Sequence, residues 1–265
     1  MLRFLLLLLL MIPLSAQAQL RLSVFDCGRL SFDDVAAFGL SNDETSVRKL
    51  FVPCYLIQHA DHLMVWDAGL PLAAVGQTDG NSRYEKSFID QLGDMDITSQ
   101  DIDFVAFSHT HYDHVGAANA FTDSTLLIQQ LEADAVFGST EPGIAMQPEL
   151  VADLQDNPRI TLTGDHDVFG DGSVRILSAP GHTPGHQVLY LELENFGPLV
   201  LSGDLYHFEF SRTNRRTPVF NTDSEQTLES MSRVEAFVRE SNATFWIEHS
   251  LELAETLDLA PAFYD

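Results

Sequence analysis

Four ligand-rich strings, each directly after an apolar run, constrain the fold of this chain more than any other feature. The first is H-T-H-Y-D-H at 109–114, which places four potential metal ligands within six residues and follows the apolar run 104–107. Such a run is typical of a buried strand. A strand that ends in a polar loop brings side chains to one place without disturbing core packing. We therefore interpret this string as part of a binding site rather than as a solvated loop.

The other three strings occupy equivalent positions farther along the chain. They are G-H-T-P-G-H at 181–186, S-G-D at 202–204 and the late His249, which follow the apolar runs 174–177, 199–201 and 244–247. One rim of a sheet sandwich would collect all four strings. Imidazole nitrogen and carboxylate oxygen together suit a borderline cation such as zinc. The candidate metal ligands are His109, His111, Asp113, His114, His182, Asp204 and His249.

Strand-like and helical runs alternate along the chain, which predicts an α/β fold. Strands are expected at 20–25, 50–58, 63–66, 104–107, 126–129, 160–162, 174–178, 187–193, 198–202 and 244–247. Helices are expected at 84–92, 115–120, 131–137 and 224–241 and close to the C-terminus. Two loop-rich excursions are expected at 29–49 and 138–158. No linker or repeat separates the candidate ligands, so residues 19–265 are predicted to form a single domain.

The N-terminal segment reads as a secretory signal. Residues 1–4 carry one arginine, an apolar run extends from 5 to 14, and A-Q-A at 16–18 resembles a cleavage site. We expect residues 1–18 to be a signal peptide and the protein to be periplasmic or secreted. The apolar run is shorter than the ~20 residues of a membrane span, so no stable membrane insertion is expected. Export permits a disulfide between Cys27 and Cys54, although buried unpaired cysteines are also common.

The charge balance narrows the range of partners. The chain has 14 basic and 39 acidic residues, a formal net charge of −25. Such a chain repels nucleic acid and anionic membrane surfaces, so a nuclease is disfavoured. The expected partner is a small molecule. One basic run, 212–216, could serve an anionic substrate or be an ordinary solvated loop.

The order of the motifs resembles the metallo-β-lactamase superfamily. H-x-H-x-D-H, G-H-T-P-G-H, S-G-D and a late histidine follow one another over nearly the whole chain after the signal. Asp204 resembles the branch with two fully ligated metals, which includes N-acyl-homoserine lactonases, glyoxalase II enzymes, phosphotriester hydrolases and tRNA-processing nucleases. Four smaller strings look most like the lactonases: D-C-G at 26–28, P-C-Y-L-I at 53–57, W-D-A-G-L at 66–70 and A-P-A-F-Y at 260–264.

This resemblance implies a four-layer αββα sandwich and a hydrolase with two Zn²⁺ per chain. By resemblance, the first metal is held by His109, His111 and His182, the second by Asp113, His114 and His249, and Asp204 bridges them. Two such cations share a water and lower its pKa, so that a metal-bound hydroxide can attack the substrate. Asp113 could then accept or pass a proton.

Lactonase relatives often carry a tyrosine three residues beyond the bridging aspartate. Here that position is His207, and Tyr206 is one residue short of it. Either His207 or Tyr206 donates a hydrogen bond to the substrate, or the substrate differs. Around the ligands, Asp67 is expected to pair with a ligand histidine. His186 is expected to support a ligand rather than to be one, and the remaining histidines, His59, His62 and His166, are expected at the surface.

The leading hypothesis is hydrolysis of N-acyl-homoserine lactones, with an acyl-chain groove lined by Phe32, Phe38, Phe208, Phe210 and Phe220. The alternative is phosphotriester or aryl-ester hydrolysis at the same metals. A glyoxalase II-like thioesterase is weaker, because a glutathione site needs Lys or Arg and a C-terminal helical extension. A binding protein without activity is disfavoured because every ligand position is filled.

Overall fold

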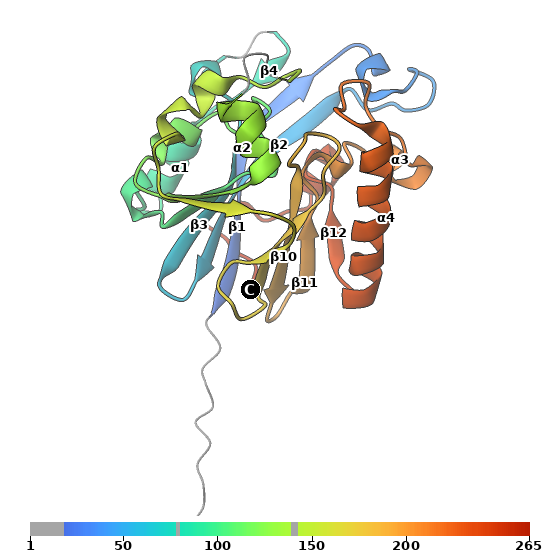
Figure 1. The fold of residues 1–265 in the computed structure, drawn as a ribbon. Coiled ribbons are helices and arrows are strands. Elements are labelled where there is room, and N and C mark those ends of the chain that lie inside the picture. The colour runs from blue at the N-terminus through green and yellow to red at the C-terminus, as the bar shows by residue number, and fades with distance from the viewer. Residues whose placement is uncertain (1–18, 78–79, 139–142) are drawn as a thin grey trace, which may run out of the picture.

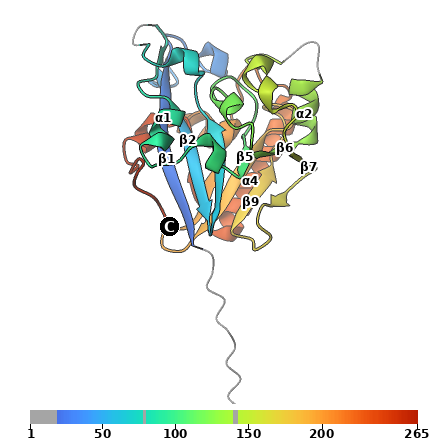
Figure 2. The ribbon, with the colours of Figure 1, turned by 90° about the vertical axis from the view of Figure 1, so that its left-hand side faces the viewer.

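Two β-sheets packed face to face form the centre of the molecule (Figure 1). The computed structural model describes residues 19–77, 80–138 and 143–265, so the predicted signal peptide lies outside the described residues. The first sheet has the strand order β4-β1-β2-β3-β5-β6-β7. Its strands are β1 (Leu20–Ser31), β2 (Lys49–His59), β3 (His62–Ala68), β4 (Ser82–Arg83), β5 (Phe104–Ala106), β6 (Thr125–Gln129) and β7 (Arg159–Leu162). Figure 2 shows β1, β2, β5 and β6 from the side of this sheet.

The second sheet has the order β12-β11-β10-β9-β8. Its strands are β8 (His166–Asp167), β9 (Val174–Ser178), β10 (Gln187–Leu193), β11 (Gly197–Leu201) and β12 (Thr244–Trp246). The longer helices are α1 (Phe88–Gly93), α2 (Gln130–Phe137), α3 (Glu209–Asn214), α4 (Ser224–Ser241) and α5 (Leu251–Ala254). None of the helices in the described ranges is both long and apolar enough to span a membrane.

Three apolar clusters hold four layers together. The central cluster lies between the sheets and includes Trp66 of β3 and Trp246 of β12. A second cluster joins the outer face of the first sheet to α1 and α2, and a third joins the outer face of the second sheet to α4. Burying one large apolar side chain in this way contributes about 1.5–3 kcal/mol. The αββα sandwich that the resemblance implied is therefore confirmed (Figure 1).

Helix α4 forms where the sequence predicts it, over 224–241. Asp223 caps its start by accepting a hydrogen bond from the Gln226 N–H, and Asn242 ends it in a left-handed conformation. Met231, Val234 and Val238 recur at helical spacing and are buried against the second sheet. Local signals and tertiary packing agree here, which is why the prediction succeeds.

The helix predicted at 115–120 is wrong. Only one short 3₁₀ turn, Ala118–Ala120, forms there. The N–H of Gly116 donates to the Gly69 carbonyl at 2.8 Å and that of Ala117 to the Ala68 carbonyl at 3.0 Å. These bonds join the ligand loop to the end of β3 instead of building a helix.

Two further elements begin or end at other residues than the sequence predicted. Strand β1 continues to Ser31 and pairs with β2 and β4, so the first excursion is shorter than predicted. Helix α1 begins only at Phe88, because Ser87 caps it and the Tyr84 hydroxyl accepts the Phe88 N–H.

Cys27 and Cys54 form a disulfide between β1 and β2, which settles a pairing that the sequence left open. Both residues are fully buried. Gly69 packs directly against them, since a Cβ added there would lie 2.4 Å from Cys27 Cβ and 2.9 Å from Cys54 Sγ. The disulfide therefore lies beneath the loop that follows β3.

Candidate metal centre

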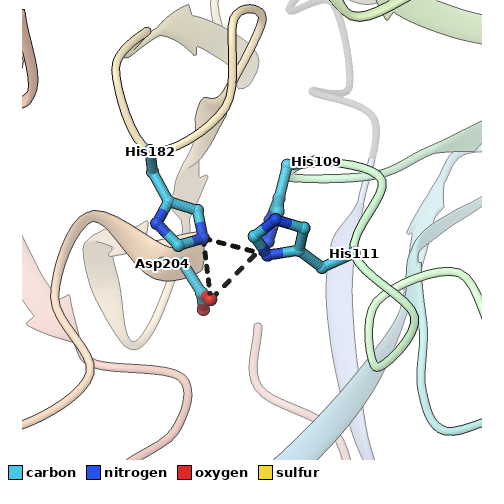
Figure 3. A group of neighbouring side chains, drawn as sticks. All are labelled: His109, His111, His182 and Asp204. Carbon is cyan, nitrogen blue, oxygen red and sulfur yellow. Dashed lines mark hydrogen bonds and ion pairs between the residues drawn. The ribbon is translucent and has the colours of Figure 1, made fainter. Parts of the chain in front are cut away.

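The four ligand strings meet at one rim of the sandwich, as their positions after strands predicted. Side chains from the ends of β5, β9, β11 and β12 converge into two groups. We call His109, His111 and His182 the first metal group and Asp113, His114 and His249 the second metal group, with Asp204 between them. Figure 3 shows the first metal group around Asp204. All seven residues are buried.

The two carboxylate oxygens of Asp204 face different groups. Oδ2 lies 3.2 Å from His182 Nε2 and 3.5 Å from His109 Nε2, and His182 Nε2 lies 3.1 Å from His111 Nδ1 (Figure 3). Oδ1 lies 2.9 Å from His249 Nε2 and 3.3 Å from His114 Nε2. His249 Nε2 is also 3.7 Å from Asp113 Oδ2. This is the arrangement expected of a carboxylate that bridges two cations.

Partners outside the centre fix which ring nitrogen of three ligand histidines faces inward. His114 Nδ1 contacts Asp67 Oδ2 at 2.7 Å, and His249 Nδ1 contacts the Phe51 carbonyl at 2.7 Å. His182 Nδ1 contacts Asn221 Oδ1 at 2.8 Å. All three partners accept hydrogen bonds, so these Nδ1 atoms donate and the Nε2 atoms face the centre. The expected pairing of Asp67 with a ligand histidine is thus present.

The donor set fits a metal ion. His114 Nε2 and His249 Nε2 both face the centre and lie only 3.3 Å apart. His109 Nε2 and Asp204 Oδ1 are buried and have no hydrogen-bond partner among the described residues. Buried polar atoms without partners are costly, and a cation shared by these atoms removes that cost. Imidazole and carboxylate donors in this number suit zinc and similar transition metals.

Burial and charge shift the pKa values of the ligands in different directions in the two groups. Burial lowers the pKa of His109 and His111 well below the ordinary range, so both stay neutral. Burial alone would raise the pKa of Asp204, but the neighbouring His207 and His249 hold it well below its usual value. The bridging position therefore carries a negative charge.

In the second metal group burial alone would lower the pKa of His114 and His249, but the Asp204 carboxylate raises the pKa of His114 well above its ordinary value and that of His249 to about 9. A cation bound there would have to displace their protons.

Tyr206 and His207 point in opposite directions. Tyr206 is in extended backbone, with φ −144° and ψ 136°, so successive side chains alternate between faces. The Tyr206 ring packs beside Phe245 in the cluster under α4, away from the ligands. His207 Nε2 lies 3.0 Å from Asp204 Oδ2. Tyr206 therefore faces away from the ligands, and His207 lies beside them.

The turn that carries Asp204 is held from two sides. His186 Nε2 accepts the Asp204 N–H at 2.9 Å, in agreement with the supporting role predicted for His186. Glu248, which the sequence reading missed, accepts the Gly203 N–H at 2.8 Å. Burial, together with the nearby Asp67 carboxylate, raises the pKa of Glu248 to about 8. Its only sequence signal was its place beside His249 after an apolar strand.

One surface prediction for the remaining histidines is wrong. His59 is buried, its ring stacks on Phe169 at 4.0 Å, and its Nε2 lies 2.8 Å from Asp171 Oδ2. His62 is exposed and His166 is half-buried.

The arginines of the basic run 212–216 form contacts within the protein. Arg212 pairs with Glu235, and Arg216 pairs with Glu44. Arg215 donates to the Leu228 carbonyl and the Ser232 hydroxyl. Its cations are thus engaged by the protein itself.

A cavity of about 200 Å³ opens onto the centre. Its polar wall contains both Asp113 and Asp204 and the histidines His111, His207 and His249. Its apolar wall is made of Leu30, Phe38, Leu50, Tyr112, Ile144, Ala145 and Phe220. A second cavity of about 480 Å³ includes Phe208 and Phe210 and shares His207 and His249 with the first. Phe32 packs against Phe38 but does not line either cavity.

Comparison with known proteins identifies the family. The family model of the metallo-beta-lactamase superfamily matches residues 47–239. The chain belongs to the metallo-β-lactamase superfamily, and the predicted class of metal-dependent hydrolase is confirmed. Within it, the chain is 27% identical to an N-acyl homoserine lactonase from Bacillus sp. over 242 residues, which cover 83% of this chain and 93% of the relative.

Solved structures show the same fold. A mutant of AiiA from B. thuringiensis with N-decanoyl-L-homoserine bound superposes with a TM-score of 0.78 at 23% identity, covering 93% of this chain and 99% of that one. AidC, described as a dizinc quorum-quenching lactonase, superposes with a TM-score of 0.68 at 16% identity and covers 88% of each chain.

Proposed function

We propose that this protein is an exported dinuclear zinc hydrolase that opens the lactone ring of N-acyl-homoserine lactones. The observation that carries the proposal is the position of Asp204, whose two oxygens face two separate donor groups at the wall of a cavity. The relatives named as N-acyl homoserine lactonases support the substrate class. All seven ligand positions are occupied by metal-binding residue types, which argues against a binding protein without activity.

The cavity suits a substrate with a polar ring and an apolar arm. The carboxylates and imidazoles at one wall would face the lactone, while Phe38 and Phe220 offer an apolar surface for the acyl chain. Phe38 lies 4.8 Å from Phe208 between ring centroids, so the aromatic surface continues toward the second cavity. An acyl chain on this surface would lose contact with water, which favours binding at about 25 cal/mol per Å² buried.

Two bound zinc ions would supply the activated water and would polarise the lactone carbonyl. The remaining chemistry falls to this chain's own side chains. Asp113 lies at the cavity wall, where its carboxylate can accept a proton and return it to the leaving alcohol oxygen as the ring opens. His207 lies at the same cavity wall, and its Nε2–H, which contacts Asp204 at 3.0 Å, would donate instead to the oxygen on which negative charge develops.

Export is part of the proposal. The N-terminal sequence supports it, and so does the buried Cys27–Cys54 disulfide, since disulfides persist mainly outside the reducing cytosol. A fusion of residues 1–25 to a reporter should be secreted and cut after Ala18. An uncut fusion that stays in the membrane would show that the segment is an anchor.

A substrate panel tests the activity. The zinc-loaded protein is given N-acyl-homoserine lactones of short and long chain, an aryl ester, an aryl phosphotriester and a glutathione thioester. We expect the lactones to be hydrolysed fastest, with one acid equivalent released per turnover. Inactivity toward lactones combined with rapid phosphotriester or aryl-ester cleavage would replace this function with the alternative.

A further inference from the structure

The buried carboxylate of Glu132 contacts two ligand loops at once. Its Oε1 accepts hydrogen bonds from the Thr110 N–H at 2.8 Å and from the Thr110 hydroxyl at 2.7 Å. Its Oε2 accepts the Gly185 N–H at 2.9 Å. Thr110 lies between two ligand histidines, and Gly185 lies in the loop that carries His182. One side chain of α2 therefore joins the two loops that supply every imidazole of the first metal group.

The close approach of Gly185 to α2 depends on its lack of a side chain. A Cβ added at Gly185 would lie 2.5 Å from both the Cβ and the backbone nitrogen of Glu132. Any other residue would push the loop away and lengthen the bond to Glu132. The second glycine of the G-H-T-P-G-H string thus serves this contact.

The partners of Glu132 among the described residues are uncharged. Two backbone N–H groups and one hydroxyl surround a carboxylate that is only 2% exposed. Hydrogen bonds to an ionised acceptor are stronger than neutral ones, and they are directional. The contact therefore fixes the position of the loops rather than neutralising a cation.

The second metal group has its own supports. His114 is held by Asp67 at 2.7 Å, and its carbonyl accepts the Ala68 N–H at 2.7 Å. His249 is held by the Phe51 carbonyl at 2.7 Å. None of these contacts passes through Glu132.

We propose that Glu132 is a positioning residue for the first metal group alone. By joining the two loops, it sets the distance between His182 and the pair His109 and His111, and so sets the affinity for one of the two ions. The inference rests on the proposed two-metal function. Loss of an outer hydrogen-bond partner typically lowers metal affinity by about 10–100-fold, and here we expect that loss at one ion only.

The test measures cobalt binding to the full mature protein by absorption and chelator competition. Glu132→Ala should weaken one of the two ions at least tenfold and leave the other within threefold. Glu132→Gln keeps one acceptor oxygen and should have a smaller effect on the same ion. Asp134→Asn changes an exposed acid on the same helix and should change neither. The weakened ion is identified by its spectrum, which should match the bands lost in His111→Ala and not those lost in His249→Ala.

Equal weakening of both ions, or none, in a folded Glu132→Ala variant would overturn the inference. If that variant does not fold, Glu132→Gln decides: selective weakening of the first-group ion supports the inference, and unchanged binding overturns it. Wild-type protein that binds no cobalt would instead count against the proposed function, so the two failures are distinguishable.

Discussion

The two metal groups use similar ligands but are held in different ways. The first metal group consists of imidazoles on two loops, joined by the Glu132 carboxylate. The second metal group includes the carboxylate of Asp113, and its His114 contacts a further carboxylate, Asp67. The His114 carbonyl of this group also accepts the Ala68 N–H at the end of β3.

This difference implies that two ions in one centre need not be bound with equal affinity. More negative charge beside the second metal group favours a divalent cation, and a backbone brace keeps its ligands in place. We expect the ion of the second metal group to be retained longer when a chelator removes the metals.

The largest expected effect comes from Asp204→Ala, because it removes the shared ligand and would erase the difference between the groups. Both ions should weaken by more than the roughly 100-fold typical of outer partners, and most activity should be lost. Metal analysis after dialysis checks this. Two ions retained at wild-type affinity would show that Asp204 does not bridge.

His207→Ala should be next in size, and it separates chemistry from metal binding. If His207 donates to the developing oxyanion, turnover should fall by about 10²–10³-fold while two ions remain bound. Tyr206→Phe is the matched control, because that ring faces α4, and it should change turnover little. An equal loss of turnover in both variants, or a loss of bound metal in His207→Ala, would show that His207 is not the hydrogen-bond donor.

Asp67→Ala tests the support of the second metal group, as Glu132→Ala tests that of the first. It should weaken only the ion of the second metal group, by about 10–100-fold, because His114 loses the acceptor of its Nδ1–H. Chelator competition with cobalt reports which ion changes. If the first metal group is affected as strongly, the two supports are not independent.

Removing the disulfide should affect the centre least. A double Cys27→Ser, Cys54→Ser variant should lose about 2–4 kcal/mol of unfolding free energy, while the affinity for either ion changes by less than tenfold. Chemical denaturation of the metal-free protein measures the first quantity. A larger change in metal affinity, confined to the second metal group, would mean that the disulfide also positions that loop.

The sequence pointed to the candidate ligands because each string is local. H-T-H-Y-D-H places several donors in one loop, and α4 carries its caps and its apolar spacing within its own residues. The supports were missed because they are tertiary. Glu132 lies in the short helix α2, which carries no ligand motif, and only folding brings it to Thr110 and Gly185.

Other errors have equally physical causes. The predicted helix at 115–120 failed because backbone N–H groups there bond to the end of β3. Tyr206 and His207 are adjacent, and only the extended backbone decides which ring faces the cavity. His59 lies in a hairpin segment that looked solvated, but Phe169 covers it from a distant part of the chain.

The most direct test of the two-group centre is a metal titration of the purified mature protein. Zinc or cobalt is added to the metal-free protein, and bound metal is measured after removal of the excess. We predict two ions per chain, with the ion of the second metal group bound more tightly. One ion or fewer per chain at saturation would contradict the account.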